Sequence, residues 1–164
     1  MNQLMKTLVP LTAQLKREGL KIVTAESCTG GMIAEALTRL PGSTAWFDRG
    51  FVTYTNEAKQ EMLGVKAEVF LTDGAVSQAC VEQMAQGALQ QAHAQVAVAV
   101  SGIAGPTGGT EVKPVGTVWM AWARQSASGE VVVKSERFLF KGDRTAVRQQ
   151  STLAALIGVK KLLV

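Results

Sequence analysis

Residues 95–102 read QVAVAVSG, an apolar run without a charged side chain. A strand of this composition is usually buried on both faces, as in a sheet that helices cover on both sides. Its neighbours along the chain fit that arrangement. The segment 78–93 is rich in Ala and Gln, and Ser77 in front of it can cap a helix. The stretch at 95–102 therefore predicts an α/β fold built in layers.

Strands and helices succeed one another along the rest of the chain in an order that favours a mixed sheet. The other predicted strands are 21–25, 50–55, 115–124 and 130–140. Only the short SASG turn separates the last two, which predicts an antiparallel hairpin. The other predicted helices are an N-terminal one that ends at Gly19, one at about 29–40, one at 57–63, and a C-terminal one capped by Asp143. The sheet should therefore be parallel in part and finish in a hairpin.

Leucines at helical spacing indicate the N-terminal helix, where Leu4, Leu8, Leu11 and Leu15 fall on one face. Pro10 lies inside this pattern and predicts a kink or a late start, because proline removes a helical hydrogen bond. The segment also lacks the long apolar core and the small-residue cleavage site of a signal peptide.

Composition limits the classes of protein to which the chain can belong. Its 164 residues are 47% hydrophobic and 18% charged, which predicts one folded domain over residues 1–164. The net charge of +4 is scattered, without the basic run that a nucleic-acid partner would favour. No apolar run reaches the ~18 residues that suggest a membrane span. The two cysteines, Cys28 and Cys80, have no metal or redox spacing, so we expect a protein of the cytoplasm.

Three loops follow predicted strands and have unusual compositions. They are ESCTGG at 26–31, TYTNEAK at 53–59 and SGIAGPTGG at 101–109. Ligands of layered α/β proteins collect at the carboxyl ends of strands, so these loops are the candidates for a functional site.

The ESCTGG loop offers two nucleophiles, Ser27 and Cys28, at a bend before a helix. The first N–H groups of that helix have no partner within it, and they can stabilise an oxyanion or bind a phosphate. The alternative is a capped turn with no chemistry. The loop differs from the GxSxG elbow, since no glycine lies two residues before Ser27.

A serine nucleophile needs a base, and the sequence favours Lys59. The one histidine, His93, is expected to end a helix at the other edge of the sheet, which argues against a Ser-His-Asp triad. A single histidine also excludes a multi-histidine metal site. Desolvation near a helix N-terminus would lower the pKa of Lys59 towards that of a base, and Ser-Lys pairs hydrolyse amides. Tyr54 can relay a proton or donate to the oxyanion. The alternatives are a surface lysine and an amphipathic tyrosine at a strand end.

The third loop and the final helix suggest a site for an anion. SGIAGPTGG has no GK[ST] ending, so it is not a phosphate-binding P-loop, but it can wrap a polar ligand. Arg144 lies in the first turn of the final helix and Arg148 one turn further. Together with helix N–H groups, Arg144 can hold a phosphate. The alternatives are a flexible connection and two solvated arginines.

Five motifs in this order resemble the CinA C-terminal domain family over roughly residues 5–160: TAESCTGG, GFVTYTNEAK, SGIAGPTGG, KPVGTVW and GDR. The resemblance implies a three-layer α/β/α sandwich that forms homodimers. It also implies a hydrolase that converts nicotinamide mononucleotide to nicotinate mononucleotide and ammonia, in pyridine nucleotide recycling, without a metal or cofactor.

The family's serine, lysine and tyrosine fall on Ser27, Lys59 and Tyr54, which the loops had already indicated. In the mechanism that we expect, neutral Lys59 takes the proton of Ser27, which attacks the carboxamide. N–H groups around Thr29 and Gly30 are expected to hold the oxyanion, and Arg144 and the 102–110 loop to hold the phosphate and ribose. The residues expected to bind the substrate are Thr29, Gly30, Gly31, Gly102, Ala104, Gly105 and Arg144.

Two rival interpretations remain open at the level of sequence. One is a cysteine hydrolase in which Cys28 attacks, since a thiol at a helix N-terminus is activated. The other is a non-enzymatic nucleotide-binding or regulatory module linked to competence or DNA damage. It predicts ligand binding without release of ammonia.

Overall fold

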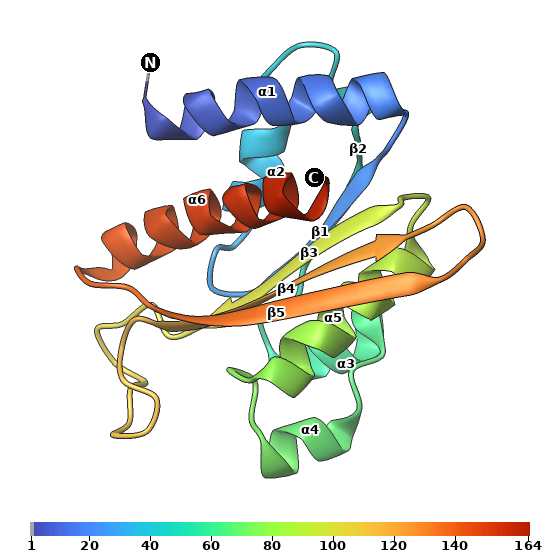
Figure 1. Cartoon of the computed structure of the whole chain (residues 1–164). Helices are drawn as coiled ribbons and strands as arrows, with labels where there is room; N and C mark the ends of the chain where they lie inside the picture. Colours follow the sequence, from blue (N-terminus) through green and yellow to red (C-terminus); the bar gives the residue numbers. More distant parts are fainter. Residues whose placement is uncertain (1) are drawn as a thin grey trace.

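The computed structural model describes residues 2–164, which form a five-stranded mixed sheet with helices on both faces (Figure 1). The strands are β1 (Ile22–Glu26), β2 (Phe47–Val52), β3 (Val96–Gly102), β4 (Thr117–Gln125) and β5 (Val131–Leu139). They lie in the order β2-β1-β3-β4-β5. β1 is parallel to β2 and β3, whereas β4 is antiparallel to β3 and β5. The predicted α/β class, partly parallel sheet and final hairpin are confirmed.

β3 is the middle strand, and the composition of 95–102 explains why. Every side chain from Val96 to Val100 is fully buried. The valines at 96, 98 and 100 belong to one apolar core, and the alanines at 97 and 99 belong to a second core on the opposite face. The absence of charge in this stretch is what allows both faces to be covered.

Each face of the sheet carries its own set of helices. One face is covered by α1 (Gln3–Glu18), α2 (Met32–Leu37) and α6 (Arg144–Leu162), and the other by α3 (Asn56–Leu63), α4 (Ala67–Thr72) and α5 (Gln78–Gln91) (Figure 1). A short 3₁₀ helix, Ser43–Ala45, precedes β2. The result is the three-layer sandwich that the resemblance implied. None of the helices described between residues 2 and 164 is long and apolar enough to cross a membrane.

Three predicted elements differ from the structure, and one helix of the structure was not predicted. The strand expected at 50–55 is β2, which ends at Val52, so the TYT sequence lies in a loop. The helix expected at 29–40 is the shorter α2, because the residues after Glu26 make a turn first. α4 was not predicted. α1 runs through Pro10 without interruption, and Pro10 faces solvent.

Candidate active site

A backbone hydrogen bond brings the first two candidate loops together. The N–H of Thr53 donates to the carbonyl of Glu26 over 2.8 Å, which continues the pairing of β1 and β2 by one step. The N–H of Ser27 donates to the carbonyl of Val100 over 3.0 Å and does the same towards β3. Ser27 therefore lies where three parallel strands end, as expected for a site in an α/β protein.

α3, which begins within the second loop, places the side chain of Lys59 next to Ser27. Thr55 caps this helix, since its side chain accepts a hydrogen bond from the N–H of Ala58 over 3.0 Å. Asn56, which by residue type could also cap a helix at 57–63, is instead the first residue of α3. Lys59 follows in the first turn, and its Nζ lies 3.0 Å from Ser27 Oγ. The structure therefore brings together the two residues that the sequence had paired.

The amine of Lys59 has three neighbours, and two of them are carbonyls. Nζ donates to the carbonyl oxygens of Thr53 and Tyr54 over 2.8 and 3.0 Å, and its third neighbour is Ser27 Oγ. Carbonyl oxygens only accept, so they fix two N–H groups of the amine. In the structure Nζ also donates to Ser27 Oγ, while the hydroxyl of Ser27 donates to the carbonyl of Tyr54. A neutral amine has two N–H groups, which the two carbonyls can keep, so its lone pair can take the position next to Ser27 Oγ, within hydrogen-bond reach of the proton that a base would remove.

Burial favours the neutral form of this lysine. Lys59 is 1% exposed, and burial lowers its pKa from the ordinary value of 10.5, while the thiols of Cys80 and Cys28 act weakly in the opposite direction. The ion pairs found within residues 2–164 do not include Lys59. A lysine that is buried without a carboxylate partner loses its proton more readily than a surface lysine.

Tyr54 contributes its backbone to this pair and points its side chain elsewhere. Its carbonyl accepts from Lys59 and, over 3.3 Å, from the hydroxyl of Ser27. Its phenol is 55% exposed and accepts a hydrogen bond from Arg144 over 2.9 Å. The phenol therefore lies beside the expected phosphate ligand, and the expected proton relay through it has no support in the hydrogen bonds described here.

Arg144 joins the third loop to the other two. Besides Tyr54, its guanidinium donates to the carbonyl of Gly105 over 2.9 Å. The cleft beside Ser27 has a volume of about 250 Å³, and all three loops and Arg144 line it. Its walls include Gly102, Ala104 and Gly105, as expected. They also include polar residues that the sequence analysis did not select, namely Asn56, Ser101 and Thr107.

Thr29, Gly30 and Gly31 follow the cleft residue Cys28, and the N–H groups of both glycines are engaged within the protein. Gly30 donates its N–H to the carbonyl of Ser27 over 3.0 Å, and Gly31 donates its N–H to Glu26 over 3.2 Å. The hydroxyl of Thr29 donates to Glu26 over 2.6 Å. The expected donation from the N–H of Gly30 to an oxyanion is therefore corrected, and a role for the N–H of Thr29 stays a prediction. Both glycines have left-handed backbones, with φ of 57° and 102°, so they shape the turn that presents Ser27.

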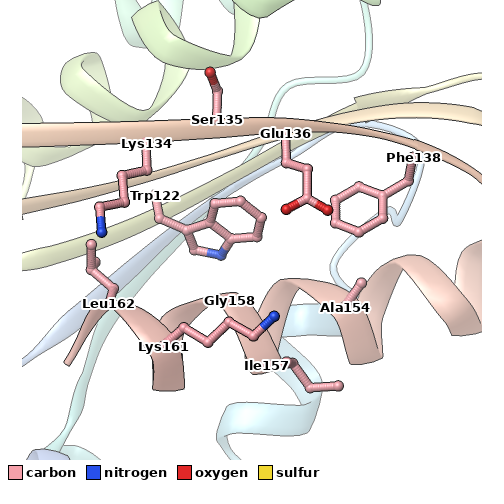
Figure 2. Close-up of a pocket in the computed structure, with 10 residues that line it drawn as sticks. All are labelled: Trp122, Lys134, Ser135, Glu136, Phe138, Ala154, Ile157, Gly158, Lys161 and Leu162. Atoms are coloured by element: carbon pink, nitrogen blue, oxygen red, sulfur yellow. The ribbon is translucent and has the colours of Figure 1, made fainter. Parts of the chain in front are cut away.

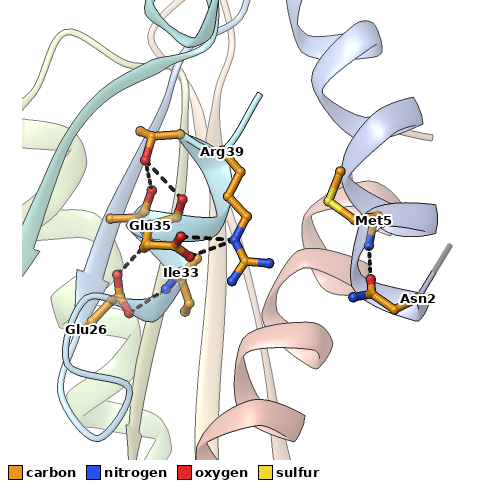
Figure 3. A network of polar contacts seen from close by, with 8 residues as sticks. Asn2, Met5, Glu26, Ile33, Glu35 and Arg39 are labelled. Atoms are coloured by element: carbon orange, nitrogen blue, oxygen red, sulfur yellow. Dashed lines mark hydrogen bonds and ion pairs between the residues drawn. The ribbon is translucent and has the colours of Figure 1, made fainter. Parts of the chain in front are cut away.

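Glu26 binds the start of α2 and so holds that turn in place, as the bond to Ile33 in Figure 3 shows. Its carboxylate is fully buried and accepts from the N–H groups of Ile33 and Ala34 over 3.0 and 2.9 Å, in addition to Thr29 and Gly31. A carboxylate at the N-terminus of a helix is stabilised by the helix dipole. The only sign in the sequence was one charged residue at the end of an apolar strand, and it was not singled out.

We expect Glu26→Gln to lower the free energy of unfolding by about 2–4 kcal/mol, because charge-assisted bonds are lost and the new amide opposes a backbone donor. Chemical denaturation followed by circular dichroism measures this. The matched control is Glu35→Gln, which removes an exposed carboxylate that pairs with Arg39 over 2.9 Å (Figure 3). It should change stability by no more than about 0.5 kcal/mol. Equal effects of the two variants would contradict the structural role of Glu26.

Arg148 fixes the same turn from the side of α6. It donates to the carbonyls of Cys28 and Thr29 over 3.0 and 3.3 Å. It therefore positions the turn rather than an anion.

His93 is exposed, and its N–H donates to Asp48 near the start of β2. His93 thus lies at the opposite end of the sheet from Ser27, where the sequence had placed it.

Cys28 is buried among these elements and poorly suited to attack. Burial raises the pKa of its thiol from 9.0 to about 11, so the thiolate is disfavoured. Cys80 is also buried, and both cysteines are free thiols. No group of three His, Cys, Asp or Glu side chains that would suit a metal ion occurs within residues 2–164.

Comparison with known proteins gives a consistent assignment. Residues 5–163 match the model of the CinA C-terminal domain. The chain is 52% identical over 155 residues to the nicotinamide-nucleotide amidohydrolase PncC of Escherichia coli K12, covering 94% of this chain and 92% of that protein. It is 54% identical over 152 residues to the protein of the same name from Pseudomonas putida, covering 93% and 92%.

A solved structure shows the same fold. The competence/damage inducible protein CihA of Agrobacterium tumefaciens is 44% identical and superposes with a TM-score of 0.91, over 99% of this chain and 96% of that one.

Proposed function

This chain belongs to the CinA C-terminal domain family, and on that premise we propose that it hydrolyses nicotinamide mononucleotide to nicotinate mononucleotide and ammonia. Ser27 is the nucleophile and Lys59 the base. The names of the relatives at 52% and 54% identity support the activity. The observation that carries the mechanism is the 3.0 Å contact between the buried amine of Lys59 and the hydroxyl of Ser27 at the edge of a cleft.

The reaction proceeds in two halves. In the first, neutral Lys59 takes the proton of Ser27 as Oγ attacks the carboxamide carbon of the substrate. The resulting ammonium gives this proton to the amide nitrogen, the carbon–nitrogen bond breaks, and ammonia leaves a nicotinoyl ester on Ser27. In the second, Lys59 takes a proton from water, the hydroxide attacks the ester, and the proton returns to Ser27 Oγ.

The carbonyls of Thr53 and Tyr54 hold the amine in both protonation states. They accept its N–H groups before the reaction and lie next to the positive charge during it. They therefore stabilise the transient ammonium without a carboxylate, whose permanent charge would raise the pKa of Lys59. We assign the oxyanion to a backbone N–H of the turn that follows Ser27, because N–H groups aimed at a developing negative charge stabilise it. The N–H groups of Gly30 and Gly31 are not available for this role, since they donate to Ser27 and Glu26.

The phosphate end of the substrate is assigned to Arg144. This guanidinium is exposed at the N-terminus of α6 and held by Tyr54 and Gly105, so its charge is oriented before a ligand arrives. Arginine suits a phosphate because its donors match two oxygens at once. The ribose lies between this group and Ser27, against the 102–108 part of the cleft wall.

Ammonia release from nicotinamide, its riboside, its mononucleotide and NAD tests the proposal. We expect kcat/KM for the mononucleotide to exceed that for the riboside by about tenfold to a hundredfold, since one charge-assisted bond to the phosphate is worth about 1.5–3 kcal/mol. Arg144→Ala should remove most of this preference and leave turnover of the riboside unchanged. If none of the four compounds releases ammonia although the mononucleotide binds, the non-enzymatic interpretation is correct.

A further inference from the structure

The sheet has one long regular edge that is free. β5 is last in the strand order and pairs with β4 along all nine of its residues without a shift in register. Three apolar side chains along it are exposed: Val131 at 40%, Val132 at 50% and Leu139 at 63%. The opposite edge strand, β2, has six residues and an irregular register against β1. Proteins commonly protect edges by such irregularities, and β5 has none along its pairing with β4.

Two hydrogen bonds show which residues of β5 present their backbone to this free edge. At one end of the hairpin, the N–H of Ser126 donates to the carbonyl of Glu130, and at the other the N–H of Phe140 donates to that of Gly116. Bonded and non-bonded pairs alternate in an antiparallel ladder. The even-numbered residues of β5 therefore bond to β4, and the odd-numbered ones direct their N–H and C=O groups outward.

The sequence of β5, VVVKSERFL, is complementary to itself about Ser135. If a second copy of the strand is laid antiparallel with the two Ser135 residues opposed, position 134 faces position 136 and position 132 faces position 138. Lys134 then meets Glu136 of the second copy, twice by symmetry, and Val132 meets Phe138. Opposite charges and apolar pairs in such positions stabilise a sheet.

The same register also pairs the outward backbone N–H and C=O groups of β5 with those of the second copy. With Ser135 opposite Ser135, the bonded pairs are those of the odd-numbered residues, which are the ones that direct their backbone groups outward. The charged pairs then occupy non-bonded positions, where side chains approach each other most closely. A shift by one residue would lose both the charge pairs and this match.

A groove between β5 and α6 is also consistent with a second copy of the chain as the partner. Figure 2 shows Lys134, Glu136 and Phe138 directed from β5 towards α6 over a cavity of about 370 Å³. Its α6 wall includes Ala154 and Ile157, which are only partly buried. In a pair joined along β5, a two-fold axis brings the α6 helices of both copies to the same face of the joined sheet. Each groove would then face the other copy instead of solvent.

We propose that β5 is the interface through which two copies of this chain join into one continuous sheet. The residues of β5 do not line the cleft at Ser27, so each copy keeps a complete site. Separation of the copies should therefore leave the activity of each chain intact. This distinguishes a failure of the interface from a failure of the proposed reaction.

Ser135→Pro is the first test, because proline removes the central outward N–H without removing a bond to β4. Ser135→Ala is its control. Both variants lose the hydrogen bond from the Ser135 hydroxyl to Glu82 at 2.6 Å, but only proline loses the N–H. By sedimentation velocity at micromolar concentration, the unchanged protein and Ser135→Ala should be dimers and Ser135→Pro a monomer with unchanged kcat. A monomeric unchanged protein, or a folded Ser135→Pro dimer, overturns the proposal.

Charge exchange gives a second test that avoids proline. Lys134→Glu alone and Glu136→Lys alone each oppose like charges twice across the axis, so each should weaken its own dimer roughly tenfold to a hundredfold. A mixture of the two variants restores both attractive pairs and should form a mixed dimer, detected with one chain labelled. This result decides the question even if Ser135→Pro does not fold. Unchanged self-association of both single variants, or no mixed dimer, would refute the register.

Discussion

Replacing Ser27 by alanine is expected to lower kcat/KM for nicotinamide mononucleotide by about 10,000-fold or more, as for other enzymes that lose their nucleophile. Without Oγ, no ester can form on the enzyme. The fold should persist, because the hydroxyl makes a single hydrogen bond as donor, to Tyr54 over 3.3 Å, and the amine of Lys59 keeps its two carbonyl partners. Steady-state release of ammonia measures the loss, and circular dichroism checks the fold.

Cys28→Ala is the matched control, since it alters the adjacent nucleophile in the same turn. The thiol is 4% exposed and its pKa is raised to about 11, so its removal should leave kcat/KM within about threefold. Thiol alkylation should likewise have little effect on the folded enzyme. The reverse pattern, an active Ser27→Ala and an inactive Cys28→Ala, would establish the cysteine mechanism instead.

The parts of the fold that were predicted from sequence are those whose pattern has a single physical explanation. An apolar stretch such as 95–102 is compatible with few environments other than a doubly covered strand, and the SASG turn between two strands allows little but a hairpin. The strand expected at 50–55 was shifted because Thr53 and Thr55 suit a strand by composition. In the structure, however, Thr55 serves as a helix cap. Local propensity does not distinguish these two uses.

Within the site, the pairing of Ser27 with Lys59 was easier to predict than the direction in which the Tyr54 side chain points. Ser27 and Lys59 were paired because the chain lacks a suitable histidine and both residues follow strands that end at one edge of the sheet. The direction of the Tyr54 side chain depends on Arg144, 90 residues away in sequence, and no local pattern reports that contact. The same holds for Glu26, whose partners are mostly backbone N–H groups of the next helix. These contacts follow from tertiary structure.

Lys59→Met should reduce kcat/KM by about 1,000-fold to 10,000-fold, because it removes the base while filling a similar volume. In the unchanged enzyme, kcat/KM should rise with pH as Lys59 loses its proton, and it should level off below the ordinary lysine pKa of 10.5, since burial lowers this pKa. Lys59→Arg is the companion variant. It keeps a cation that does not lose its proton in this range, so it should be as inactive as Lys59→Met.

The same shift predicts how stability depends on pH. The pKa of Lys59 is lower in the folded protein than in the unfolded chain, so between the two values the unfolded chain binds more protons. The free energy of unfolding then gains a contribution that increases with pH up to about 10.5 and is complete above it. Lys59→Met removes this contribution, which chemical denaturation at several pH values would reveal as a flatter profile. If the two profiles are parallel, Lys59 is not desolvated in the folded protein, and it would then be too basic to accept the proton of Ser27.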